Sequence, residues 1–111
     1  MPDQRFTGAY SFVCQYNATD ALARRLNEIS DWKWGVGDSY WYGDYCVARP
    51  FPGVRIRIID FPKGAPEGWL YDSDIRIDQK CVTPTAVIDA AYRKILAAIP
   101  AHDIQAIESF D

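Results

Sequence analysis

The stretch "VRIRIID", residues 54–60, is the clearest strand in the sequence and decides the fold class. Its apolar side chains alternate with two arginines, which is the period-2 pattern of a strand that buries one face. Val54, Ile56 and Ile58 are expected to face a core, with Arg55 and Arg57 facing away from it. A loop rich in proline and glycine then leads to "WLYDSDIRID", 69–78, which alternates in the same way. Two such strands joined by a short loop pair antiparallel.

Two more segments upstream are expected to be extended. Residues 9–16, "AYSFVCQY", alternate cleanly between apolar and polar side chains. Residues 39–49 read as a single strand rich in aromatic residues, which Pro50 and Pro52 bring to an end. These segments add two strands to the sheet.

Helical spacing occurs twice. The first helix is expected to be capped by Asn17 or Thr19 and to run to about Ile29, with Leu22 and Leu26 on its buried side. The second helix has Thr83 as its expected N-cap and Pro84 in its first helical position, and Pro100 stops it. Its predicted buried stripe consists of Ile88, Ala91, Tyr92, Ile95 and Ile99.

The predicted order is therefore β-α-β-β-β-α, with a final short strand favoured in the tail. Helices that are apolar on one side need a sheet to cover. The sequence predicts an α+β two-layer sandwich, a mostly antiparallel sheet of four or five strands with both helices on one face. The 111 residues are expected to form a single globular domain, 1–111. The other sheet face is expected to be open to solvent.

The segment "DSYWYGDY", 38–45, raises the question of which aromatic side chains face the helices. The more apolar alternate set, Trp41, Tyr45 and Val47, is expected on the helix side. The other set is Tyr40, Tyr42, Asp44, Cys46 and Ala48, which would then lie on the open face. A shift of one residue would reverse this assignment.

The open face has two interpretations. In the first, Arg55 and Arg57 lie across from Asp72, Asp74 and Arg76 as a charge ladder that keeps the sheet soluble. In the second, tyrosines among arginines and aspartates form a surface that recognises another protein, because Tyr and Arg supply many interface hot spots. The residues predicted to bind the partner are Tyr40, Tyr42, Asp44, Arg55, Arg57, Asp72 and Asp74, with Trp32 and Trp34 at the rim. The alternative for the two tryptophans is a lid over one end of the core.

Composition narrows the classes of partner. The net charge of −3 argues against nucleic acid and against an anionic membrane surface. Three widely spaced cysteines suit free thiols in a reducing compartment, and no signal peptide or spanning segment is expected, so the predicted location is cytoplasmic. A second copy of the chain is a further candidate for the open face.

The sequence gives little support for a metal site or for catalysis. The acidic residues of 72–78 lack the spacing of a calcium loop, and His102 with scattered thiols gives no zinc site. No metal, no cofactor and no catalytic residue is predicted. We expect a non-catalytic protein-binding module, of an immunity or inhibitor type. The alternative is a sugar or nucleotide binder, or a hydrolase, using Asp38 and Asp44 beside the tryptophans.

Overall fold

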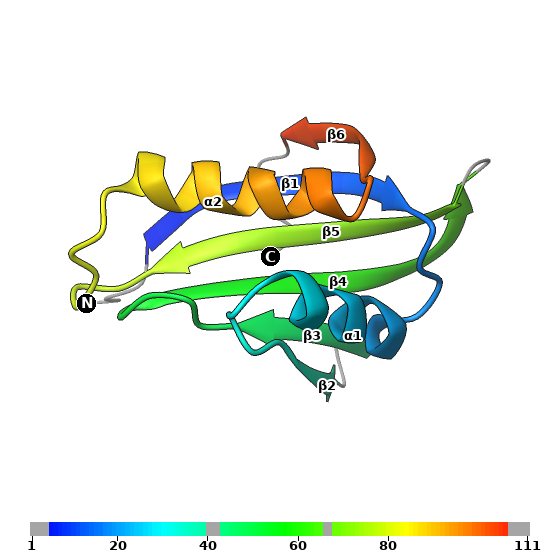
Figure 1. Ribbon diagram of the computed structural model, residues 1–111, viewed down its shortest axis with the longest axis horizontal. Coiled ribbons are helices and arrows are strands. Elements are labelled where there is room, and N and C mark those ends of the chain that lie inside the picture. The colour runs from blue at the N-terminus through cyan, green and yellow to red at the C-terminus, as the bar shows by residue number, and fades with distance from the viewer. Residues whose placement is uncertain (1–4, 40–42, 66–67, 107–111) are drawn as a thin grey trace.

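The structure is a computed structural model that describes residues 5–39, 43–65 and 68–106. It has six strands and two helices (Figure 1). The strands are β1 (Arg5–Cys14), β2 (Gly35–Ser39), β3 (Gly43–Ala48), β4 (Val54–Ala65), β5 (Gly68–Ile77) and β6 (His102–Ala106). The helices are α1 (Thr19–Ile29) and α2 (Thr85–Ala98).

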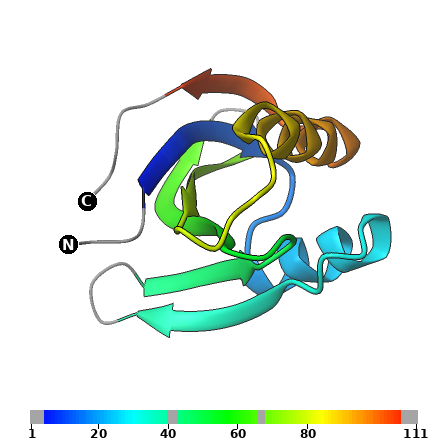
Figure 2. The same ribbon diagram turned by 90° about the vertical axis from the view of Figure 1, so that its left-hand side faces the viewer.

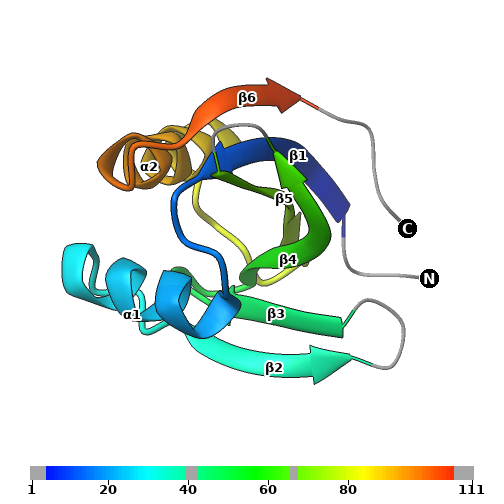
Figure 3. The same cartoon turned by 90° about the vertical axis from the view of Figure 1, so that its right-hand side faces the viewer.

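The six strands form one antiparallel sheet in the order β2-β3-β4-β5-β1-β6. The sheet is strongly curved, and both helices lie on its concave side (Figure 3). Helix α1 covers the β2–β3 end, and α2 runs along β1 (Figures 1 and 2). The predicted α+β sandwich with two helices on one sheet face is therefore confirmed, with six strands in place of four or five.

The core fills the space between the concave face and the helices. Its sheet layer comes from the alternation seen in the sequence, since Val54, Ile56 and Ile58 are buried there. Phe12 of β1 stacks on Tyr71 of β5, with ring centroids 5.7 Å apart. Helix α2 contributes Ile88, Tyr92, Ile95 and Leu96, and α1 contributes Leu22, Ala23 and Leu26. One continuous core thus joins both helices to the sheet.

Polar contacts also fasten α2 to the sheet. The Tyr10 hydroxyl of β1 donates a hydrogen bond to Asp89 Oδ1, and Arg93 Nε donates to Asp89 Oδ2 over 3.0 Å. Arg93 lies over the Tyr10 ring, 4.8 Å from its centroid. Burial, with the hydrogen bond to Asp89, raises the pKa of Tyr10. The cluster fixes the position of α2 along β1.

The aromatic segment differs from its prediction. It is a hairpin of β2 and β3, and Trp41 with its two neighbours lies outside the described residues. On β3, Cys46 and Ala48 are buried in the core, while Tyr45 and Val47 are half-buried on the convex face. The predicted orientation was therefore wrong by one residue. The cause is that Cys46 pairs with Ile58 and Ala48 with Ile56, so the small side chains join the buried face of β4.

The ends of the helices also differ from prediction. The N-cap of α1 is Ala18, between the two candidates, and the N-cap of α2 is Pro84. The tail forms strand β6, as favoured, along β1. Within the described residues, neither helix is long and apolar enough to cross a membrane.

Candidate functional site

The convex face of the sheet carries a buried ion network. Arg57 of β4 lies directly across from Asp74 of β5, between Val47 of β3 and Ala9 of β1 in the same row. Asp74 Oδ2 accepts hydrogen bonds from Arg57 Nη2 at 3.2 Å and Arg76 Nε at 2.9 Å. Arg57 is 8% exposed and Asp74 only 1%. A carboxylate held this way by two arginines is part of the scaffold, because breaking a buried pair is strongly unfavourable.

The next row of the sheet places two like charges together. Arg55 of β4 lies directly across from Arg76 of β5. Like charges opposite each other in a sheet are destabilising. Arg76 is partly neutralised by Asp74, whereas Arg55 has no ion pair in the described part of the chain, and its Nε is buried there without a hydrogen-bond partner. Among the described residues, this row therefore holds the charge of Arg55 without a paired carboxylate.

Both arginines line a surface pocket of about 500 Å³, here called the arginine pocket. Its walls are formed by Arg49, Pro50, Phe51, Pro52, Gly53, Val54, Arg55, Arg76, Asp78 and Lys80. Four of these side chains are cationic and one is a carboxylate. Neither Arg49 nor Lys80 has an ion pair within residues 5–39, 43–65 and 68–106. The pocket is a local basic region on a chain whose net charge is −3.

The charges of the pocket act on one another. Burial lowers the pKa of Arg55, and the neighbouring guanidinium groups of Arg57, Arg76 and Arg49 lower it further, while Asp74 opposes them. Arginine nevertheless keeps its charge in proteins. An anion placed in the pocket would relieve this repulsion.

Two turns close the pocket. The first, around Gly53, is fixed by a hydrogen bond from Val54 N to Phe51 O at 3.0 Å. Gly53 has φ +77, and a Cβ there would lie 2.5 Å from both Asp78 Oδ1 and Cys81 N. Asp78 N donates to Gly53 O over 2.8 Å, which joins this turn to the second one after β5. Only glycine fits this junction.

An aromatic cluster borders the pocket. The rings of Trp32 and Phe51 lie edge to face, with their centroids 6.0 Å apart. Trp32 also stacks on Trp34, with ring centroids 6.2 Å apart. The Asn27 side chain of α1 holds this loop, because it accepts from Trp34 N and donates to Trp34 O. A second pocket, of about 310 Å³, is lined by Trp32, Lys33 and Arg49 among others. Basic and aromatic side chains thus continue past the arginine pocket along the same end of the sheet.

The residues predicted to bind a partner fall into three groups. Tyr40 and Tyr42 lie outside the described residues. Arg57 and Asp74 are buried, so the expectation of a solvent-exposed sheet face was wrong for them. The physical reason is that buried side chains surround this pair, with Ala9 beside Asp74 in the same row and Ile59 in the next row. Trp34 is buried in the core cluster and Trp32 packs against it, which favours the alternative of a lid over one end of the core.

The third group remains accessible. Arg55, Asp72 and Trp32 are half-buried, and Asp44 is exposed. Arg55 lines the arginine pocket and Trp32 contacts its Phe51 wall. Asp72 lies one row beyond Asp74, on the side away from the arginine pocket and across from Ile59, and burial raises its pKa. Asp44 lies at the exposed end of the β2–β3 hairpin.

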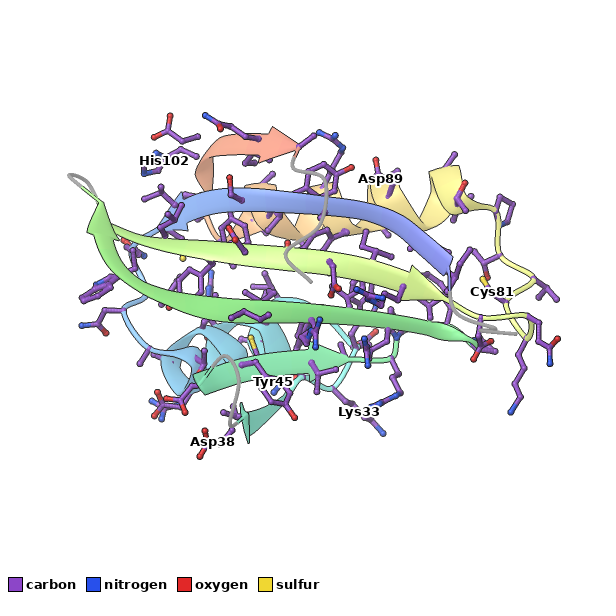
Figure 4. The ribbon with its side chains drawn as sticks, turned by 180° about the vertical axis from the view of Figure 1, so that it is seen from behind. Lys33, Asp38, Tyr45, Cys81, Asp89 and His102 are labelled. Atoms are coloured by element: carbon purple, nitrogen blue, oxygen red, sulfur yellow. The ribbon has the colours of Figure 1, made fainter. Side chains whose placement is uncertain are left out.

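Asp38 and Asp44 are direct partners across the β2–β3 hairpin, and both are exposed. Trp32 and Trp34 do not lie beside them, because both tryptophans come before the start of β2, at the opposite end of that strand from Asp38. Figure 4 shows Lys33 and Asp38 at the two ends of that strand, with Tyr45 between them. In the described part of the chain, no three His, Cys, Asp or Glu side chains come close enough to hold a metal ion.

Sequence reasoning missed Arg49, Phe51 and Lys80 as site residues, and it placed Arg76 only in the charge ladder. Each lies in or beside a turn, and the turns meet only through the pairing of β4 with β5. One signal was available: aligning the two alternating segments in antiparallel register places Arg55 across from Arg76.

Comparison with protein-family models, with curated proteins and with solved structures found no match to this chain.

Proposed function

We propose that this chain is a non-catalytic module that binds another protein through the arginine pocket and its aromatic border. The observation that carries the proposal is the Arg55–Arg76 row, where two guanidinium groups lie opposite each other in a surface pocket of an acidic chain. Charge complementarity then favours a partner that presents an acidic group. Trp32 and Phe51 supply the aromatic contact area that interfaces favour.

The proposed role is that of an immunity or inhibitor protein, which acts by covering its partner. Arginine and tryptophan residues are common hot spots of such interfaces. The proposed compartment is the cytoplasm, because Cys14, Cys46 and Cys81 are all present as thiols. Burial raises the pKa of Cys14, which keeps that thiol protonated and unreactive.

The test is photo-crosslinking from inside the pocket. A photoreactive amino acid replaces Pro52, which is exposed at the pocket wall, and the cross-linked protein is identified by mass spectrometry in lysate from the native cell. A matched probe at Ala97, which is exposed on α2, serves as control. One partner specific to position 52 is expected, and its yield should fall as salt rises. Identical products from both positions would refute the proposal.

Substitutions in the pocket give a second test. Arg55→Gln with Lys80→Gln should reduce the cross-link from position 52 by about ten-fold or more, since each change removes a charged contact. Arg24→Gln, on the exposed side of α1, should leave the yield unchanged. An equal loss in both would show that net charge, and not the pocket, governs binding.

A further inference from the structure

We propose that the group recognised in the arginine pocket is a phosphate monoester dianion, held by Arg55 and Arg76. This inference rests on the proposed function in taking the arginine pocket as the binding surface. It goes further by naming the chemistry of the bound group.

The first argument is charge. The pocket wall carries Arg49, Arg55, Arg76 and Lys80 against the single carboxylate of Asp78. Asp78 Oδ1 accepts a hydrogen bond from the backbone N of Lys80 at 2.8 Å, which holds that carboxylate in the turn. Arg76 is paired with Asp74, so Arg49, Arg55 and Lys80 are the cations of the wall without an ion pair among the described residues, and one carboxylate from a ligand would balance only part of their charge. A phosphate monoester carries a charge of about −1.5 to −2 at pH 7, which matches the wall better.

The second argument is geometry. Side chains directly opposite on neighbouring strands have Cβ atoms about 4.5–5.5 Å apart, so the ends of Arg55 and Arg76 can reach one tetrahedral group. Arginine presents a planar fork of donors that fits phosphate oxygens. Arg76 is held in place by its Nε bond to Asp74, which Arg57 holds from the other side. Arg55 lines the pocket, and its Nε is buried without a hydrogen-bond partner among the described residues.

The third argument concerns the rest of the ligand. The lining also has an apolar part, which is made of Pro50, Phe51 and Pro52. At about 500 Å³ the pocket has room for more than a phosphate group. The structure therefore favours a monoester whose organic part is apolar, such as an aryl phosphate. Such a group can belong either to a phosphorylated side chain of a partner or to a free small molecule.

Calorimetric titration of the whole chain tests the inference, in a phosphate-free buffer of fixed chloride concentration. Phenyl phosphate is expected to bind saturably, about ten-fold or more tighter than benzoate, which has the same ring and one carboxylate. Glycerol phosphate, with a polar organic part, should bind more weakly than phenyl phosphate. No saturable heat with phenyl phosphate, or equal affinity for benzoate, would overturn the inference.

Variants locate the site. Arg55→Gln should lower the affinity for phenyl phosphate by about ten-fold or more, which is the loss expected for a hydrogen bond to a charged group. Arg24→Gln should leave this affinity unchanged. Arg55→Lys keeps the charge but removes the fork, so it should reduce the preference for phenyl phosphate over benzoate. Thermal unfolding of each variant confirms that it folds. An unchanged affinity in folded Arg55→Gln would contradict the assignment.

The two proposals can fail separately. Equal affinity for benzoate and phenyl phosphate removes the phosphate inference but leaves an acidic protein partner possible. Phenyl phosphate binding without any specific cross-link from position 52 removes the protein partner but supports the phosphate site. Phosphatase treatment of the lysate separates the sources. A lost cross-link assigns the phosphate to the partner, and a retained one assigns it to a free ester.

Discussion

Asp74 is the side chain on which the charge balance of the convex face depends. It is fully buried and receives hydrogen bonds from Arg57 and Arg76. Asp74→Ala would leave these guanidinium groups without their shared carboxylate. We expect a loss of about 3–5 kcal/mol in the free energy of unfolding, measured by urea denaturation, because an uncompensated charge would be left buried.

Asp44→Ala is the matched control for this change, since Asp44 is an exposed carboxylate on the same sheet. Its cost should stay within about 0.5 kcal/mol. If Asp74→Ala cost as little as Asp44→Ala, the Arg57–Asp74 pair would contribute no more to stability than an exposed surface ion pair does.

Asp72 lies next to this network, but its ionised carboxylate destabilises the folded state, whereas that of Asp74 stabilises it. Burial raises the pKa of Asp72, so the folded state holds its proton more tightly than the unfolded state does. The ionised carboxylate therefore opposes folding at neutral pH, and the opposition disappears once pH falls below about 3.9, the usual pKa of aspartate. Asp72→Asn should raise the melting temperature at pH 7 and leave it unchanged near pH 3. The exposed Asp31→Asn should show no such pH-dependent gain.

For individual residue pairs, the sequence predicted part of the site. Alternation alone predicted that Arg55 and Arg57 would lie across from Asp72, Asp74 and Arg76. The Arg57–Asp74 and Arg55–Arg76 pairs confirm this for two of the three, whereas Asp72 lies across from Ile59. Alternation could not predict that the first pair is buried and the second lines a pocket. Burial depends on the flanking rows, and these come from strands far apart in the chain.

Among the elements, the β2–β3 hairpin depends on a close contact between Gly37 and its partner Tyr45. A Cβ on Gly37 would lie 2.5 Å from Cζ of the Tyr45 ring. Gly37→Ala should therefore displace the ring and lower the free energy of unfolding by about 1 kcal/mol. Urea denaturation measures the change.

Gly35 provides the control, because a Cβ there would meet nothing within 4 Å. Gly35→Ala on the same strand should be neutral or slightly stabilising, since alanine restricts the unfolded chain more than glycine does. In a Tyr45→Ala background the cost of Gly37→Ala should vanish, which is the non-additivity expected of residues in contact. Strictly additive effects would show that the ring does not rest on Gly37.

The same hairpin explains why the orientation of the aromatic segment was predicted wrongly. Large aromatic side chains occur at alternate and at consecutive positions between 40 and 45, so hydrophobicity alone does not choose a face. The choice came from Ile56 and Ile58 of β4, which place Ala48 and Cys46 opposite them in the core. Such a register is a property of two strands together.

For the molecule as a whole, the fold class could be predicted because it follows from patterns within each segment. Four alternating segments and two one-sided helices have few ways to bury their apolar faces together. The curvature of the sheet was not predictable, and neither was the pocket that forms where two of its turns meet. Both depend on how the long strands β4 and β5 run across the whole molecule, and a pattern within one segment carries no information about that arrangement.

A single core that includes both helices predicts cooperative unfolding. Leu96 of α2 is fully buried, and so is Leu26 of α1 in the same cluster. Leu96→Ala should lower the free energy of unfolding by about 2–5 kcal/mol, as expected for a cavity in a core. Because the core is shared, tryptophan emission, which includes Trp34 beside α1, should report the same urea midpoint as far-UV circular dichroism in this variant. If the Leu96→Ala midpoint fell only by circular dichroism while tryptophan emission kept the parent midpoint, the α1 and α2 halves of the sheet would be separate folding units.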